Sequence, residues 1–333
     1  MPSKASVSAQ AEAIRGGDRR ALARAITLIE STRPDHRVHA ESLITALLPW
    51  SGNSVRLGIS GVPGVGKSTF IESFGLEIIN NSHKVAVLAV DPSSPKTGGS
   101  ILGDKTRMEE LSKNPSAFIR PSPSSGTLGG VARRTREVML VTEAAGFDVV
   151  IVETVGVGQS ETAVAGLVDM FILLIVPGGG DELQGIKKGI VELADLVVVN
   201  KADGDLMAAA ERAKRDYGAA LHLLRAANRE WPPRVMSCSS LQKSGIGDVW
   251  KTVKMFCETM TNSGGFEHRR QGQAKAWMWD EVNESIANAL RHNEKIAASL
   301  PALEVQVESG SLAPAQAARI ILREFGVLKD IET

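Results

Sequence analysis

Residues 61–69 read Gly-Val-Pro-Gly-Val-Gly-Lys-Ser-Thr, which matches the phosphate-binding pattern G-x-x-x-x-G-K-[ST]. The glycines let the backbone curl until successive N–H groups point at one anion. In this pattern Lys67 reaches the β- and γ-phosphates, and the Ser68 hydroxyl coordinates Mg²⁺. The sequence therefore predicts a nucleoside triphosphate site with Mg²⁺, lined by Gly61, Val62, Pro63, Gly64, Val65, Gly66, Lys67, Ser68 and Thr69.

The residues on either side of this loop favour a strand–loop–helix unit. The apolar run 55–60 predicts a strand that leads into the loop, and residues 68–79 predict a helix whose N-terminus faces the phosphates. Further short apolar runs alternate with helical segments up to about residue 240, and such continuous runs indicate strands buried on both faces of a parallel sheet. We predict an α/β P-loop domain with a mostly parallel sheet flanked by helices, with strands at 56–60, 85–90, 117–120, 149–152, 170–176, 196–199 and 234–238.

Helical patterns precede this α/β region and follow it. At the N-terminal side, Asp18 is expected to cap one helix, and a second helix ends near Pro49. At the C-terminal side, a break at 262–265 is followed by a long helix and by shorter helices at 301–308 and 314–325. The long helix carries an apolar stripe made of Trp279, Val282, Ile286, Ala289 and Leu290.

This pattern predicts three parts. Residues 1–50 form a helical extension, residues 51–260 form the P-loop domain, and residues 261–333 form a helical dimerisation arm. We favour a dimerisation arm for residues 261–333, because a long apolar stripe outside the sheet domain needs a partner surface. Packing of the stripe on its own domain is the alternative.

The composition argues against several kinds of partner. Lys plus Arg and Asp plus Glu both number 38 in 333 residues, so the chain gives no reason to expect nucleic acid or an anionic membrane as a partner. No apolar run reaches the roughly 20 residues that span a bilayer, and the first residues lack the apolar core of a signal peptide. The expected location is cytoplasmic, with an organelle after removal of a leader as the alternative.

A second motif identifies the base. Asn200-Lys201-Ala202-Asp203 follows an apolar strand directly, at the edge where open α/β sheets bind ligands. The Asp203 carboxylate can accept two parallel hydrogen bonds, from N1–H and the N2 amino group of guanine, and adenine has no such donor pair. Asn200 braces the loop, and the Lys201 stem lies over the ring. The predicted nucleotide is GTP or GDP, with Ser239, Ser240 and Leu241 as further contacts near the base.

Segments between the two motifs are expected to surround the γ-phosphate. Asp91 and Glu153 each end a predicted strand, and Glu153 stands where most GTPases have the Asp of D-x-x-G. Such carboxylates bind Mg²⁺ or orient water, and the N–H of Gly156 can detect the γ-phosphate. Asp104 lies in a glycine-rich stretch that suits a mobile loop. The predicted catalytic residues are Lys67, Asp91, Asp104 and Glu153, and the predicted Mg²⁺ ligands are Ser68, Asp91, Asp104 and Glu153.

Some of these assignments have structural alternatives. Asp91 is also a common turn residue at the end of a strand, and Asp104 is also a common helix N-cap. Gln159 is a candidate for orienting water, but its separation from Gly156 does not by itself place it there.

Three runs together resemble one known family. They are Val-Asp-Pro-Ser-Ser at 90–94, Glu-Thr-Val-Gly-Val-Gly-Gln-Ser-Glu at 153–161 and Pro-Gly-Gly-Gly-Asp-Glu at 177–182. On these runs the chain resembles the MeaB/ArgK family, which are GTPase chaperones of adenosylcobalamin-dependent methylmalonyl-CoA mutase and counterparts of the human methylmalonic aciduria type A protein. The resemblance covers nearly the whole chain and is closest to the bacterial members.

The resemblance implies a GTPase of the SIMIBI class that forms a homodimer through its C-terminal helices. It implies slow GTP hydrolysis that the mutase stimulates, gating of adenosylcobalamin delivery, and protection of the mutase. It also implies a third switch that passes the nucleotide state to the mutase. The residues assigned to switching and partner signalling are Gln159, Asp181, Gln184 and Lys187.

Other functions stay open at this point. A P-loop phosphotransferase of the amino-acid transport kinase type would need an acceptor site near the γ-phosphate, and the sequence offers no candidate. A metallochaperone GTPase for another metalloenzyme usually carries Cys and His metal-binding motifs. Cys238 and Cys257 have no second Cys or His at ligand spacing.

Overall fold

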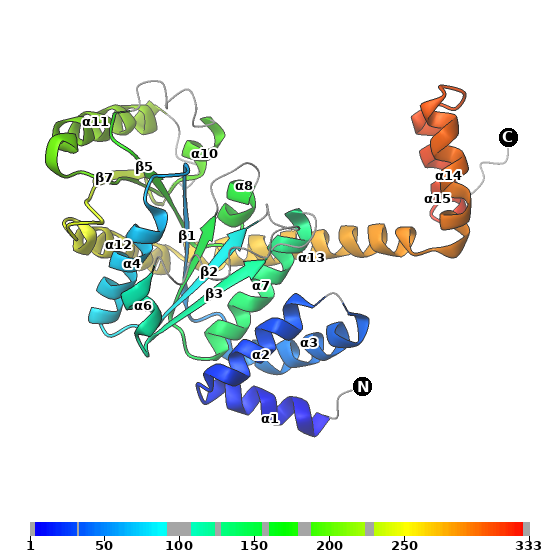
Figure 1. Cartoon of the computed structure of the whole chain (residues 1–333), viewed down its shortest axis with the longest axis horizontal. Coiled ribbons are helices and arrows are strands. Elements are labelled where there is room, and N and C mark those ends of the chain that lie inside the picture. The colour runs from blue at the N-terminus through cyan, green and yellow to red at the C-terminus, as the bar shows by residue number, and fades with distance from the viewer. Residues whose placement is uncertain are drawn as a thin grey trace. The chain divides into compact units, whose positions relative to one another are not determined.

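The structure is a computed structural model, and it describes residues 4–31, 33–91, 108–123, 128–154, 160–178, 188–223 and 230–328. The chain divides into two compact units, Met1–Gln273 and Ala274–Thr333. The first unit holds a sheet flanked by helices, and the second is helical (Figure 1). The three-part division predicted from the sequence stays a prediction.

The described residues form a seven-stranded sheet with the order β3-β2-β4-β1-β5-β6-β7, and every pair of neighbouring strands is parallel. The strand β1 lies at the centre between β4 and β5, so the loop that follows it opens at the middle of the sheet. The strands are β1 (Val55–Gly61), β2 (Val85–Asp91), β3 (Ala117–Pro123), β4 (Val149–Thr154), β5 (Met170–Ile175), β6 (Leu196–Val199) and β7 (Arg234–Ser237). The predicted α/β P-loop fold is confirmed, and its apolar runs form the sheet because both faces of the sheet are covered.

Helices cover both faces of this sheet. On one face, Phe70 and Phe74 of α4 (Lys67–Asn80) and Phe256 of α12 (Ile246–Ser263) join Leu57 and Ile59 of β1 in the main hydrophobic core. On the other face, α7 (Leu128–Ala144) and α8 (Ser160–Ala165) pack on β4. The remaining helical elements of this α/β region are α6 (Glu109–Lys113), α10 (Lys188–Leu193), η2 (Gly204–Leu206) and α11 (Met207–Leu223).

The N-terminal helices α1 (Lys4–Arg15), α2 (Arg19–Glu30) and α3 (Pro34–Leu47) pack on one another, and all three contact α7. The Asp18 side chain accepts hydrogen bonds from the N–H groups of Arg20 and Ala21, so the predicted cap of the second helix is confirmed. The chain then passes through the short helix η1 (Leu48–Trp50) into β1.

The second unit contains the C-terminal part of α13 (Gly265–Arg291) together with α14 (Glu294–Glu308) and α15 (Pro314–Glu324), which pack against each other. The prediction that a helix begins at Pro301 is wrong, because Pro301 lies inside α14. This helix begins earlier because the Asn293 side chain caps it by accepting from the N–H groups of Lys295 and Ile296.

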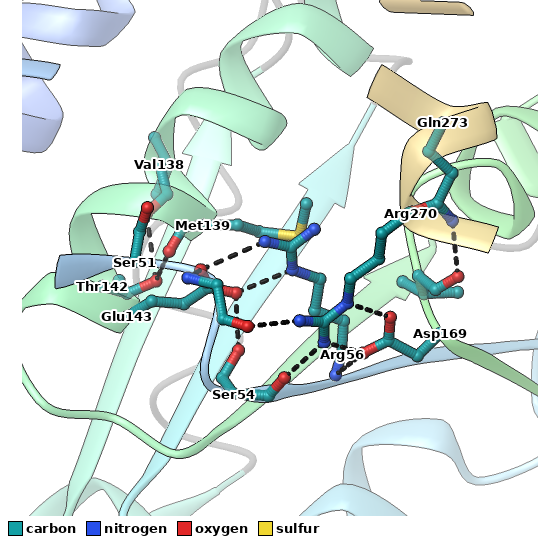
Figure 2. Close-up of polar contacts among 12 residues, drawn as sticks. Ser51, Ser54, Arg56, Val138, Met139, Thr142, Glu143, Asp169, Arg270 and Gln273 are labelled. Carbon is teal, nitrogen blue, oxygen red and sulfur yellow. Dashed lines mark hydrogen bonds and ion pairs between the residues drawn. The ribbon is translucent and has the colours of Figure 1, made fainter. Parts of the chain in front are cut away.

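A buried ion network holds the first residues of α13 to the N-terminal edge of the sheet (Figure 2). The Arg270 guanidinium donates to both carboxylate oxygens of Asp169, at 2.8 and 2.6 Å, and to the carbonyl oxygens of Gly52 and Ser54. Asp169 also accepts from the N–H of Arg56 on β1, whose guanidinium is paired with Glu143 on α7 at 2.7 Å. Four charges from distant parts of the sequence therefore neutralise one another in the interior of the first unit.

Candidate nucleotide-binding site

The phosphate-binding motif forms the loop between β1 and α4, at the C-terminal edge of the sheet. Gly66 has a φ of 93°, and a methyl group at this position would lie 2.9 Å from the side-chain nitrogen of Asn200. Only glycine meets both requirements, because its left-handed backbone and the close approach leave no room for a side chain. The helix α4 then begins at Lys67, so its first N–H groups point toward the loop.

The Lys67 ammonium folds back over this loop. It donates to the carbonyl oxygen of Gly61 at 2.7 Å and to that of Val62 at 3.4 Å. Burial lowers the pKa of Lys67, and the carboxylates of Glu153 and Glu161 oppose that shift. An anion bound in the loop would replace these carbonyl contacts and stabilise the ammonium charge.

Ser68 and Glu153 provide oxygen atoms that fit Mg²⁺. The Ser68 hydroxyl donates to the Glu153 carboxylate over 3.5 Å, and Glu153, at the end of β4, is only 7% exposed. A hydroxyl and a carboxylate are hard oxygen donors, which Mg²⁺ prefers, and Mg²⁺ in such sites takes its other ligands from phosphates and water. Among the residues that the structure describes, no group of three or more His, Cys, Asp or Glu side chains could hold a metal ion.

Asn200 connects the base-binding motif to the phosphate loop. Its side-chain nitrogen donates to the carbonyl oxygen of Val65 at 2.9 Å, although the two residues are 135 positions apart. Its side-chain oxygen accepts from the N–H of Ser240 at 3.2 Å and from the Ser240 hydroxyl at 2.7 Å. Asn200 is 1% exposed, so this one amide fixes three loops of the site relative to one another.

Asp203 and Lys201 contact two different loops of the site. The Ser239 hydroxyl donates to the Asp203 carboxylate, which positions that carboxylate beside the loop after β7. Lys201 has a φ of 58° and its ammonium donates to the carbonyl oxygen of Gly64 at 2.7 Å. The stem of Lys201 therefore runs between the two loops, where it can cover one face of a base.

No sequence pattern predicted a role for Ser73, which supports the loop that follows β7. The Ser73 hydroxyl, on α4, donates to the carbonyl oxygen of Ser240 at 2.8 Å, and Ser73 is 5% exposed. No local pattern marks this residue, since the contact joins positions 167 residues apart. In contrast, the predicted Leu241 side chain is 78% exposed and is free to meet a ligand.

Several other predicted site residues lie partly or wholly outside the described part of the chain. Asp91 is the last residue of β2. Its side chain is not among the described parts of the structure, so the predictions for it stay predictions. The predictions for Asp104, Gly156, Gln159, Asp181, Gln184 and Lys187 also lie outside the described residues. In the described part of the chain, no helix is both long and apolar enough to cross a membrane.

The chain is similar to proteins that are described as GTPases. It is 56% identical over 311 residues to a putative GTPase of Caulobacter vibrioides, covering 93% of this chain and 95% of that protein. It is 50% identical over 314 residues to the GTPase ArgK of Escherichia coli, covering 94% of this chain and 95% of that protein. It is 48% identical over 319 residues to the mitochondrial methylmalonic aciduria type A homolog of Mus musculus, covering 93% of this chain and 77% of that protein.

A solved structure supports the P-loop fold described above. The crystal structure of a protein described as LAO/AO transport system kinase superposes with a TM-score of 0.78 at 41% identity, covering 98% of this chain and 99% of that one. Residues 22–295 match the profile of the family described as methylmalonyl-CoA mutase-associated GTPase MeaB. With the phosphate loop, the guanine motif and these relatives in agreement, the chain belongs to the MeaB family of GTPases.

Proposed function

We propose that this protein is a GTP-hydrolysing chaperone that gates the delivery of adenosylcobalamin to methylmalonyl-CoA mutase and protects that mutase. The observation that carries the proposal is the Asn200 amide, which joins the guanine motif to the phosphate loop and so supports one site for the whole nucleotide. The family description and the methylmalonic aciduria type A relatives support the choice of mutase as partner.

The residues of the site suit GTP hydrolysis. The Lys67 ammonium would leave the Gly61 carbonyl and bind the β- and γ-phosphates, where it stabilises the charge that develops during phosphoryl transfer. Ser68 and Glu153 would hold Mg²⁺, which neutralises phosphate charge when it is bound. Asp203 would select guanine, because its carboxylate can accept both N–H donors of that base.

The proposal includes a slow reaction that the mutase accelerates. We assign Asp91 and Asp104 to Mg²⁺ binding and catalysis, and Gly156 to detection of the γ-phosphate. The residues that we assign to switching and partner signalling are Gln159, Asp181, Gln184 and Lys187. This assignment rests on the resemblance of the runs at 90–94, 153–161 and 177–182 to the family. The proposed output of the reaction is a change of conformation rather than a released metabolite. Such an output fits a GTPase whose partner recognises which nucleotide is bound.

The second unit supports a homodimer. Trp279 is 54% exposed, Ile286 is 49% exposed and Val282 is 37% exposed, and their spacing of three and four residues places them on one face of α13. Large apolar side chains gathered on one helix face are expected to be covered by another surface. We propose that a second copy of this chain covers this stripe.

A kinase is the second candidate, because the 41% identical solved structure is described as a transport system kinase. The two functions differ in where the γ-phosphate goes. With γ-labelled GTP, a GTPase releases the label as inorganic phosphate, whereas a kinase transfers it to an acceptor. A pull-down of methylmalonyl-CoA mutase with this protein tests the proposed partner, in the presence of GDP and of a non-hydrolysable GTP analogue. We expect the amount of mutase recovered to differ between the two nucleotides. Recovery of no mutase with either nucleotide would contradict the proposed partner.

A further inference from the structure

Two buried hydroxyl groups meet where the strands β1 and β4 reach the nucleotide site. The Thr154 hydroxyl donates to the Ser60 hydroxyl at 2.8 Å, although the two residues are 94 positions apart. Both side chains are fully buried. A buried hydroxyl is costly unless it is hydrogen-bonded, so this contact stabilises the ends of both strands.

The two hydroxyls lie at the points from which two parts of the nucleotide site begin. Ser60 is the residue directly before Gly61, where the phosphate loop starts. Thr154 is the residue directly after Glu153, and it precedes Gly156 by two residues. The contact therefore joins the start of the phosphate loop to the end of the strand that carries the Glu153 carboxylate.

The hydroxyl contact extends the pairing of the two strands. The backbone pairing of β1 with β4 ends at Ile59 and Glu153, whereas the pairing of β2 with β4 continues to Val90 and Thr154. At Thr154, β4 is thus held to β2 through its backbone and to β1 through the side chain of Thr154. Ser60 is a firm attachment point, because β5 pairs with it on its other side.

The contact lies on one face of the sheet, and the Glu153 carboxylate lies on the other. Successive residues of a strand point to opposite faces. Gly58, two residues before Ser60, faces α8, because an added methyl group there would lie 3.1 Å from a side chain of that helix. Glu153, next to Thr154, reaches the Ser68 hydroxyl on α4 over 3.5 Å. A bond on the α8 face therefore fixes the backbone from which Glu153 projects toward Ser68.

We infer that Thr154 is a positioning residue for Mg²⁺, because its bond to Ser60 keeps the Glu153 carboxylate beside the Ser68 hydroxyl. Mg²⁺ demands near-ideal geometry with ligand distances of about 2.1 Å, so a small displacement of its oxygen donors weakens binding. Thr154 does not touch the cation or the nucleotide. It acts through the backbone that it shares with Glu153.

The inference rests on the proposed guanine nucleotide site with Mg²⁺. Its test measures the dissociation constants of GDP and of a non-hydrolysable GTP analogue, with Mg²⁺ and with EDTA, for wild type and Thr154→Val. Valine has nearly the shape of threonine and lacks the hydroxyl. Wild type should bind more tightly with Mg²⁺, and the variant should lose roughly tenfold of this gain while it keeps its affinity in EDTA.

Further variants separate the bond from the side chains that make it. Ser60→Ala removes the other hydroxyl and should cause the same loss, and the double variant should lose no more than either single one. Ser60→Ala also tests the bond if Thr154→Val does not fold, which thermal melting checks. Thr154→Ser keeps a hydroxyl and should keep most of the magnesium dependence.

Thr142→Val is the matched control. Thr142 is also fully buried, but its hydroxyl donates to the carbonyl oxygens of Val138 and Met139 on its own helix, α7. This variant removes the same group at the same depth, and it should leave the magnesium dependence unchanged.

Two results would overturn the role of Thr154 and leave the GTPase assignment intact. One is a loss of the same factor with and without Mg²⁺, which would show general support of the loop. The other is an unchanged magnesium dependence in both Thr154→Val and Ser60→Ala. Wild-type protein that bound no guanine nucleotide, or bound it equally with and without Mg²⁺, would overturn the inference together with the proposed site.

Discussion

The side-chain amide of Asn200 donates a 2.9 Å hydrogen bond to the backbone carbonyl of Val65, so the guanine motif is attached to the phosphate loop. The same side chain accepts two hydrogen bonds from Ser240, in the loop after β7. The relative position of the two motifs therefore depends on one buried group, and the first prediction follows from this dependence.

We expect Asn200→Ala to weaken GTP and GDP binding together, by roughly 10- to 100-fold, because the loops lose their common support and buried polar atoms lose their partners. Isothermal titration with both nucleotides measures the change. Ser112→Ala is the control, since its hydroxyl donates to the Glu109 carbonyl of its own helix, α6. A variant that lost affinity for GTP alone would contradict the shared support.

Asp203→Asn should change which base is bound. The new amide presents a donor where guanine also presents a donor, so GTP affinity should fall by about 100-fold or more. Xanthosine triphosphate has a carbonyl oxygen in place of the N2 amino group, and the variant should bind it better than wild type does. Competition of GTP, ATP and xanthosine triphosphate against a fluorescent nucleotide measures the order. An unchanged preference for GTP would remove Asp203 from base recognition.

The buried ion network should make stability depend on pH. The pKa of Glu143 is lowered: burial alone would raise it, but that effect is outweighed by the hydrogen bond and charge of Arg56. A lowered pKa stabilises the folded state above the unfolded value of about 4.3, and this contribution is lost as pH falls through the lower folded value. We expect Glu143→Gln to cost about 3 kcal/mol at neutral pH, because it leaves Arg56 buried without its counter-charge.

Urea unfolding at pH 7 and below pH 4 measures this effect. The difference between wild type and Glu143→Gln should shrink at the lower pH, where wild-type Glu143 also loses its charge. Glu12→Gln, at an exposed position, is the control for removing a carboxylate. A difference that stayed constant with pH would show that packing, rather than charge, explains the loss.

The apolar stripe on α13 should govern self-association. Val282→Glu places a charge among large exposed apolar side chains, and we expect it to convert a dimer into a monomer. Light scattering after size exclusion measures the mass. Asn288→Glu, on the other side of the same helix, should leave the dimer intact. A wild-type protein that is monomeric at micromolar concentration would contradict the proposed arm.

Lys187→Ala tests the proposed third switch. Because we assign Lys187 to signalling rather than to nucleotide contact, the variant should bind GTP normally and lose most of the stimulation by the mutase. Phosphate release with and without the mutase measures this, and GTP affinity is the internal control. Full stimulation in the variant would exclude Lys187 from the mechanism.

The sequence predicts the local features of this fold well. Apolar runs mark the strands because both faces of the sheet are covered, and Asp18 marks a helix start because its side chain bonds the backbone of its own helix. The phosphate loop and the base motif are found for the same reason, since each motif is a short stretch with its chemistry in consecutive residues.

Contacts between distant positions could not be found in this way. Arg270 and Asp169 are 101 residues apart, and Ser73 and Ser240 are 167 apart, so neither pair leaves a local pattern. The helix start predicted at Pro301 is wrong, since proline is common in the first turn of a helix but here lies within α14.

The central claim is that this chain hydrolyses GTP at a rate set by its partner. The most direct measurement is phosphate release from GTP by the purified protein, alone and with adenosylcobalamin-dependent methylmalonyl-CoA mutase, with Lys67→Ala as the inactive reference. We predict slow release by the protein alone, clearly faster release with the mutase, and none above background for the variant. Release that the mutase leaves unchanged, or that equals the rate of Lys67→Ala, would contradict the account.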